Sequence, residues 1–188
     1  MTEATRRPKR ADAQRNRERL IAVARDAFVA TDTATSLEAV ARAAGVGIGT
    51  LYRHFPTREA LVDAVYAAEL DDVTGCAPEL LRIHPADVAL RGWMDRYAAF
   101  VTTKRGMLDT LRSGWAAGTI ATPDTRARIT QVLADFLESG ATQRVLRDDV
   151  PAEDVTTALV GIFLSTATVG NPAQVERLLD LLVAGLRP

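Results

Sequence analysis

The stretch from Thr35 to Phe55, TSLEAVARAAGVGIGTLYRHF, decides the fold at the front of this 188-residue chain. Its first half places apolar residues at i, i+3, i+4 and i+7: Leu37, Val40, Ala41 and Ala44. Residues at this spacing share one side of a helix, so the pattern predicts a short helix with one buried face. Thr35 and Glu38 have the spacing of a capping box, which satisfies free N–H groups at a helix start.

Gly45 marks the end of that helix, since glycine adopts without strain the positive φ that often follows a helix. Val46 and Leu51 are then placed to pack a second short helix against the first. Two helices joined by such a turn form a helix-turn-helix, whose second helix enters the major groove of DNA. The alternative is a helical hairpin that has no role in DNA binding.

The second helix leaves six residues on or near its outer surface: Ile48, Gly49, Thr50, Tyr52, Arg53 and His54. Arg53 is the candidate for direct base readout, because a guanidinium binds O6 and N7 of guanine in bidentate fashion. Ile48 is placed to contact a thymine methyl group. Two alternatives stay open: Tyr52 as a half-buried core residue, and His54 as a capping or packing histidine.

The string AGVGIGTLYRHFPTREAL, from Ala44 to Leu61, resembles the signature of the TetR family of bacterial transcriptional regulators. The resemblance is dense from about Arg15 to Tyr66. Beyond that it concerns the architecture, although residues 149–188 are also similar to the end of many such proteins.

This resemblance implies that Thr50, Tyr52 and His54 contact DNA and that Arg58 holds the DNA backbone. The chain departs from the family pattern at Gly47, where many relatives have Ser or Thr. Glycine caps a helix only a few tenths of a kcal/mol worse than serine, so we expect the helix to form without the hydroxyl–phosphate contact.

The charge of the chain is uneven. Residues 1–66 hold 11 Arg and Lys against 8 Asp and Glu, whereas the remainder holds 12 against 16. A basic patch beside a helix-turn-helix is typical of phosphate binding. We expect residues 1–10 to form a basic flexible arm, which is either a DNA anchor or a solvated tail. Its basic residues are Arg6, Arg7, Lys9 and Arg10.

The composition is that of an ordinary globular protein, with 47% apolar and 25% charged residues. No apolar run approaches the ~18–20 residues that span a bilayer, and the N-terminal arginines are not followed by the hydrophobic core of a secretory signal. The single cysteine, Cys76, excludes an internal disulfide and fits a reducing compartment. We therefore expect a cytoplasmic protein with no membrane contact.

The periodicity predicts an all-α protein of about nine helices, since no long alternation of period 2 is present. Prolines suited to the first position of a helix mark several of the later starts. Outside the helix-turn-helix, the expected helices are 12–30, 57–81, 85–103, 106–116, 123–142, 151–169 and 172–186. The expected domains are the arm 1–10, the DNA-binding domain 11–66, and an effector-binding and dimerisation domain 67–188.

Large apolar residues gather in the middle of the chain: Trp93, Tyr97, Phe100, Met107, Leu111 and Trp115, with Phe136 and Phe163 on later helices. Their default interpretation is a packed core. The alternative interpretation is that they line a pocket for a small, apolar effector. The resemblance favours the effector pocket, because TetR-type bodies usually hold one among these helices. Candidate polar groups for it are Arg112, Ser113, Gln131 and Asp135.

The last two helices carry a broad apolar surface: Val155, Leu159, Ile162, Val175, Leu178, Leu179, Leu182 and Leu186. This is too broad for one face of a helix in a monomer. Ala158, Gly161 and Ser165 lie between these residues and permit close approach of a neighbouring helix. We predict a two-fold homodimer through a four-helix contact; the alternative is a terminal helix buried within a monomer.

Together these features predict a homodimeric, ligand-responsive repressor that binds a palindromic operator in double-stranded DNA. The rivals are an activator and a DNA-binding protein without an effector. We do not expect an enzyme, a metal site or a cofactor. His54, His84 and Cys76 lack the spacing of zinc ligands, and the sequence holds no glycine-rich phosphate loop and no nucleophile motif.

Overall fold

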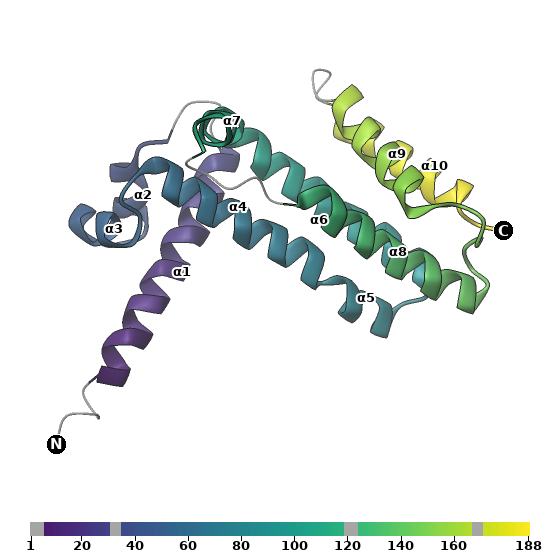
Figure 1. Ribbon diagram of the computed structural model, residues 1–188, viewed down its shortest axis with the longest axis horizontal. Helices are drawn as coiled ribbons and strands as arrows, with labels where there is room; N and C mark the ends of the chain where they lie inside the picture. The colour runs from purple at the N-terminus through teal and green to yellow at the C-terminus, as the bar shows by residue number, and fades with distance from the viewer. Residues whose placement is uncertain (1–5, 31–34, 119–123, 167–170) are drawn as a thin grey trace. The chain divides into compact units, whose positions relative to one another are not determined.

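The computed structural model describes residues 6–30, 35–118, 124–166 and 171–188, and over these residues it contains ten α-helices and no β-strand. The all-α prediction is confirmed. In chain order the helices are α1 (Arg6–Ala30), α2 (Leu37–Ala43), α3 (Ile48–His54), α4 (Arg58–Gly75), α5 (Ala77–Ile83), α6 (Ala86–Gly106), α7 (Leu108–Ala117), α8 (Thr125–Gln143), α9 (Ala152–Ser165) and α10 (Pro172–Gly185) (Figure 1).

The observed helices differ from the expected ones chiefly at two places. The helix predicted over 57–81 is divided into α4 and α5 near Cys76, because Pro78 has no N–H to donate to the preceding turn. Helix α1 begins at Arg6, before the expected start near residue 12. Pro8 is compatible with that start, since the first four N–H groups of a helix have no partner inside the helix.

The helices group into two compact units. The first unit comprises residues 1–69 with 102–122, and the second comprises 70–101 with 123–188. The expected division placed its boundaries after residues 10 and 66 and assigned 102–122 to the body. Two long helices, α4 and α6, contribute one end to each unit.

The core of the first unit is built on one face of α1. Leu20, Ala24 and Phe28 are buried there at helical spacing, and α2 packs against both α1 and α3. The end of α6 also lies against α1 in this unit: a methyl group added at Gly106 would overlap the backbone oxygen of Phe28. A glycine at this position is what permits the close approach of the two helices.

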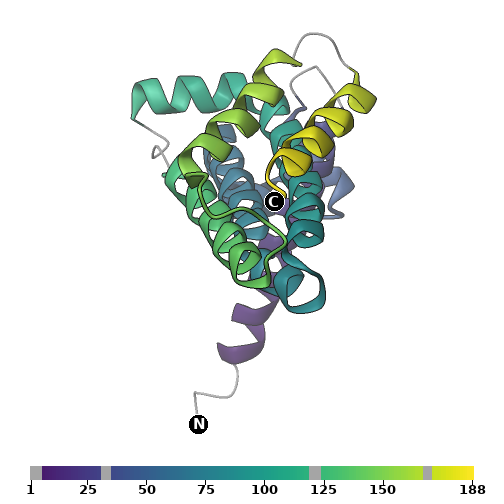
Figure 2. The ribbon, with the colours of Figure 1, turned by 90° about the vertical axis from the view of Figure 1, so that its right-hand side faces the viewer.

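In the second unit, α8 packs against α5 and α9, and α9 packs against α10. Helices α9 and α10 lie side by side in both views (Figures 1 and 2). The N–H of Trp93 on α6 donates to the carbonyl oxygen of Val73 on α4 at 2.7 Å, which satisfies its indole inside the core.

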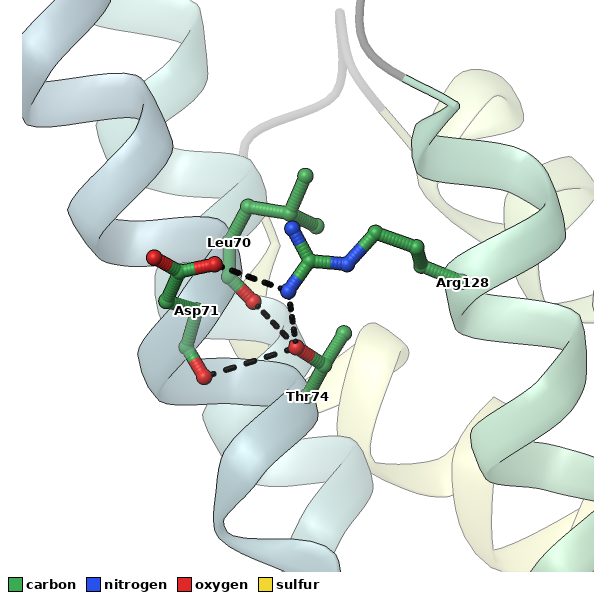
Figure 3. Close-up of polar contacts among 4 residues, drawn as sticks. All are labelled: Leu70, Asp71, Thr74 and Arg128. Atoms are coloured by element: carbon green, nitrogen blue, oxygen red, sulfur yellow. Dashed lines mark hydrogen bonds and ion pairs between the residues drawn. The ribbon is translucent and has the colours of Figure 1, made fainter.

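Arg128 links α8 to the end of α4 (Figure 3). Its guanidinium donates to a carboxylate oxygen of Asp71 at 2.8 Å and to the hydroxyl of Thr74 at 2.6 Å. That hydroxyl in turn donates to the carbonyl oxygen of Leu70 at 2.8 Å. Because Asp71 is 70% exposed, the ion pair contributes less than ~1 kcal/mol, so its effect is mainly on the relative position of the two helices.

No helix in the described part of the chain has the length and apolar character required to cross a membrane.

Candidate nucleic-acid interface

The start of α2 is fixed by two adjacent hydroxyl residues. The hydroxyl oxygen of Ser36 accepts from the N–H of Ala39 at 3.2 Å, so Ser36 is the N-cap. The hydroxyl of Thr35 donates to the carbonyl oxygen of Ala27 on α1 at 3.3 Å. The predicted capping box of Thr35 and Glu38 is therefore wrong by one residue, because Thr35 bonds to α1 and leaves the cap to Ser36.

The turn between α2 and α3 depends on Gly45, whose φ is +68°. Its N–H donates to the carbonyl oxygen of Arg42 at 3.1 Å, and the N–H of Val46 donates to that of Ala41 at 3.0 Å. This pair of bonds is a Schellman motif, which needs a left-handed residue at the glycine position. The predicted end of the first helix is confirmed.

Helix α3 has one buried face and one exposed face. Leu51 is buried, as is Phe55 just after the helix. The opposite face presents Ile48, Tyr52 and Arg53 to solvent, with Ile48 38% and Tyr52 44% exposed. The alternative of Tyr52 as a core residue therefore does not hold, and a hydroxyl, a guanidinium and an apolar group lie on one outer surface.

The remaining α3 positions flank that surface. Gly47 is the N-cap without a side-chain bond, and its carbonyl oxygen accepts from the N–H of Thr50 at 2.8 Å. Gly47 and Gly49 are exposed, and Thr50 is half-buried. His54 is also half-buried, with its ring centroid 6.3 Å from that of Phe55, so packing is part of its role.

Arg58 at the start of α4 is engaged within the first unit. Its guanidinium donates to the carbonyl oxygen of Thr35 and, at 3.4 Å, to the hydroxyl of Thr110 on α7. It also lies over the ring of Phe28, 5.4 Å from the centroid. This internal role of Arg58 could not be predicted from the sequence, because its partners come from three distant segments.

Other charged groups lie around α3. Arg42 is exposed in the last turn of α2, and Arg17 on α1 lies over the ring of Phe55 at 5.3 Å. At the start of α4, the carboxylate of Glu59 accepts hydrogen bonds from the backbone N–H of Glu59 and from the hydroxyl of Thr57, and these bonds lower its pKa. Thr57 caps α4 by accepting from the N–H of Ala60 at 3.2 Å.

The predicted arm side chains of Arg6, Arg7, Lys9 and Arg10 lie outside the described side chains.

The eight residues predicted to line a pocket are divided between the two units. Five rings of the second unit pack on one another, with centroids 5.4 to 5.9 Å apart. They are Trp93, Tyr97 and Phe100 on α6, Phe136 on α8 and Phe163 on α9, all buried. Met107, Leu111 and Trp115 belong to the first unit.

The polar groups suggested for that pocket have other surroundings. Arg112 and Ser113 are exposed on α7. Gln131 and Asp135 are exposed on α8, where the amide of Gln131 donates to the carboxylate of Asp135 at 2.9 Å. These four residues are exposed, and a role for them in a pocket stays a prediction.

The residues predicted for the dimer interface divide into two sets of four. Val155, Leu159, Leu179 and Leu186 are buried within the protomer and form part of its core. Ile162, Val175, Leu178 and Leu182 are half-buried. Leu164 and Leu181 belong to the same apolar surface of the sequence and are the most exposed leucines of these two helices, at 72% and 68%.

Comparisons with known proteins agree with this architecture. Residues 20–65 match the model of the bacterial regulatory proteins of the tetR family, and residues 85–188 match that of the C-terminal domain of SbtR-like transcriptional regulators. A TetR transcriptional regulator from Streptomyces coelicolor is 41% identical, with a TM-score of 0.83 over 92% of this chain and 98% of that one.

A TetR regulatory protein from Mycobacterium vanbaalenii is 30% identical, with a TM-score of 0.76 over 96% of this chain and 100% of that one. The matched C-terminal model covers more than half of the chain, and both structures align over nearly its whole length. The family consists of DNA-binding regulators rather than enzymes. The chain therefore belongs to the TetR family of bacterial transcriptional regulators.

Proposed function

We propose that this regulator is a cytoplasmic, homodimeric repressor that binds a palindromic operator and releases it when a small molecule binds. The observation that carries the proposal is the outer surface of α3, where Ile48, Tyr52 and Arg53 are exposed beside a buried Leu51. A recognition helix needs this division, because it must pack on the domain and reach base edges at once.

On this surface each group has a distinct role. Arg53 reads a guanine through O6 and N7, and Ile48 contacts a thymine methyl group. The hydroxyls of Thr50 and Tyr52 and the ring of His54 bind phosphates, which position the helix without reading sequence. Arg6, Arg7, Lys9 and Arg10 add charge that favours DNA binding at low salt.

The dimer is proposed to form through the outer faces of α9 and α10. Leu164 and Leu181 are exposed there, and Ala158, Gly161 and Ala184 are exposed small residues on the same two helices. A Cβ added at Gly161 would meet nothing within 4 Å inside the protomer. Small residues beside exposed leucines allow the helices of a second copy to approach closely, and half-buried Leu178 and Leu182 complete the contact.

Two alternatives to a ligand-responsive repressor are an activator and a regulator that binds no effector. The ring-on-ring packing of Trp93, Tyr97, Phe100, Phe136 and Phe163 favours a solid core in the second unit. Groups suited to a ligand lie in the first unit, where Trp115 has a buried N–H without an acceptor among the described residues. A reporter with the operator overlapping its promoter separates repression from activation by the sign of the response.

Selection of binding sites from random duplex DNA tests the DNA function. The purified chain is expected to enrich an inverted repeat, and Arg53→Ala to lose preference at one base of each half-site, with a cost of ~1–3 kcal/mol against the preferred site. Arg112→Ala, which removes an exposed charge on α7, is the control. An unchanged consensus with Arg53→Ala would show that Arg53 does not read bases.

A further inference from the structure

Lys104, near the end of α6, is a half-buried cation between two aromatic rings of the first unit. Its ammonium nitrogen lies 5.5 Å from the ring centroid of Tyr66 on α4 and 5.8 Å from that of Trp115 on α7. Burial alone lowers the pKa of Lys104, and within the described residues no carboxylate pairs with it. The rings stabilise the cation, but they do not replace an anion.

Trp115 adds a second donor at the same place. Its Nε1 is buried and has no hydrogen-bond acceptor among the described residues, whereas the equivalent atom of Trp93 donates to a backbone oxygen at 2.7 Å. The ring of Trp115 meets that of Tyr66 edge-on, with centroids 6.1 Å apart. A buried N–H without an acceptor is destabilising, so the cluster formed by Tyr66, Lys104 and Trp115 has two donors that an added acceptor would satisfy.

We propose that Lys104 and Trp115 bind the carboxylate of a small apolar acid, and that Tyr66 and the Trp115 ring contact its hydrocarbon part. A carboxylate supplies the negative charge that Lys104 lacks and an oxygen for the indole N–H. A neutral lactone, ester or alcohol offers an acceptor without the charge. The proposal rests on the proposed function, in that it names the chemical class of the effector.

The cluster is connected to the recognition helices within the first unit. Helix α7 carries Trp115 and also Thr110, whose hydroxyl accepts from Arg58 at 3.4 Å. Arg58 donates on its other side to the carbonyl oxygen of Thr35, next to the N-cap of α2. A ligand that moves α7 therefore acts on the start of the helix-turn-helix through Arg58, provided it binds the two arrangements with different affinity.

Calorimetric titration of the full chain with hexanoate, octanoate and decanoate, each compared with the alcohol of equal length, tests the site. At least one acid is expected to bind, and to bind at least tenfold tighter than its alcohol. Lys104→Met should weaken that acid at least tenfold and leave the alcohol unchanged, and Trp115→Phe should weaken the acid several-fold. Arg112→Met, which removes an exposed cation on α7, should bind as the wild type does.

No binding of any of the three acids to the wild type overturns the site, as does equal affinity in the wild type and Lys104→Met. Melting curves check the fold: Lys104→Met should melt no lower than the wild type, since it removes an uncompensated buried charge. If it unfolds, Trp115→Phe decides alone, and an unchanged acid affinity in that variant overturns the proposal.

Operator binding measured with and without the acid separates the two proposals. If the acid binds through Lys104 but the operator is not released, the site stands and the ligand-responsive part of the proposed function fails. If the selected operator binds and the acids do not, the DNA function stands and the site fails. By linkage, an acid that weakens operator binding must itself bind more weakly by the same factor when the operator is present.

Discussion

Arg53 and Arg58 lie five positions apart, and their surroundings differ completely. Arg53 is exposed on α3, whereas Arg58 is held by Thr35, Thr110 and the ring of Phe28. The sequence predicts Arg53 as a surface residue because helical spacing alone separates it from buried Leu51. It does not predict the contacts of Arg58, because they depend on the tertiary packing of α1, α4 and α7.

The role of Arg58 is testable by separating stability from DNA binding. Arg58→Ala should destabilise the protein by ~1–3 kcal/mol, since it removes a cation–π contact and a hydrogen bond to a backbone carbonyl. Arg58→Lys keeps the charge over Phe28 but not the forked hydrogen bonds, so its melting temperature should lie between those of the wild type and Arg58→Ala. If Arg58 instead holds a phosphate, Arg58→Ala leaves stability unchanged and reduces the salt slope of DNA binding by ~1.

The ends of individual helices can be predicted from the sequence where they depend on one residue and not on tertiary contacts. Gly45 predicts the end of α2 correctly because a positive φ is a property of one residue. The capping box fails because Ser36 and Thr35 are chemically equivalent as caps, and the choice depends on the bond from Thr35 to Ala27 of α1. Gly106 gives no signal in the sequence, since its importance arises from the backbone of Phe28.

Two glycines on α6 form a matched pair for testing helix packing. Gly106→Ala should destabilise by ~1–3 kcal/mol, because the new methyl group overlaps a backbone oxygen that cannot rotate away. Gly92→Ala meets nothing within 4 Å and should stabilise by ~0.5–1 kcal/mol, because alanine favours the helix. In a chain of this size each kcal/mol shifts the melting temperature by ~2–4 °C. Equal melting temperatures for the two variants would contradict the close approach of α6 and α1.

For the molecule as a whole, the sequence predicts the all-α class and the exposed face of α3 but not the two compact units. Residues 102–122 join the first unit although they follow it by more than thirty residues, so only three-dimensional contacts reveal it. For the same reason the sequence does not predict that the residues of the expected aromatic pocket belong to two units. Trp93 and Trp115 lie on helices that are neighbours in the sequence, but Trp93 is in the second unit and Trp115 in the first. Burial likewise separates Leu179, in the protomer core, from exposed Leu181.

The dimer is tested on the two exposed leucines. Leu164→Glu and Leu181→Glu should each shift sedimentation from twice the chain mass of 20.3 kDa toward a monomer, because the contact must then desolvate a carboxylate. Melting of the protomer core should change little, since these side chains are 72% and 68% exposed. Ile83→Glu, at an exposed apolar residue of α5, is the control and should remain dimeric. A wild-type chain that is monomeric at micromolar concentration would rule out the interface.

If two copies of α3 bind one operator as a unit, the affinity of the protein for DNA depends on the spacing of the half-sites. Fluorescence anisotropy would compare the selected inverted repeat with a duplex carrying five extra base pairs between its half-sites. The insertion moves one half-site by about half a helical turn of ~10.5 base pairs. With the insertion, affinity should fall to that of a single half-site; an affinity unchanged by the insertion would show that the two copies of α3 do not bind as one unit.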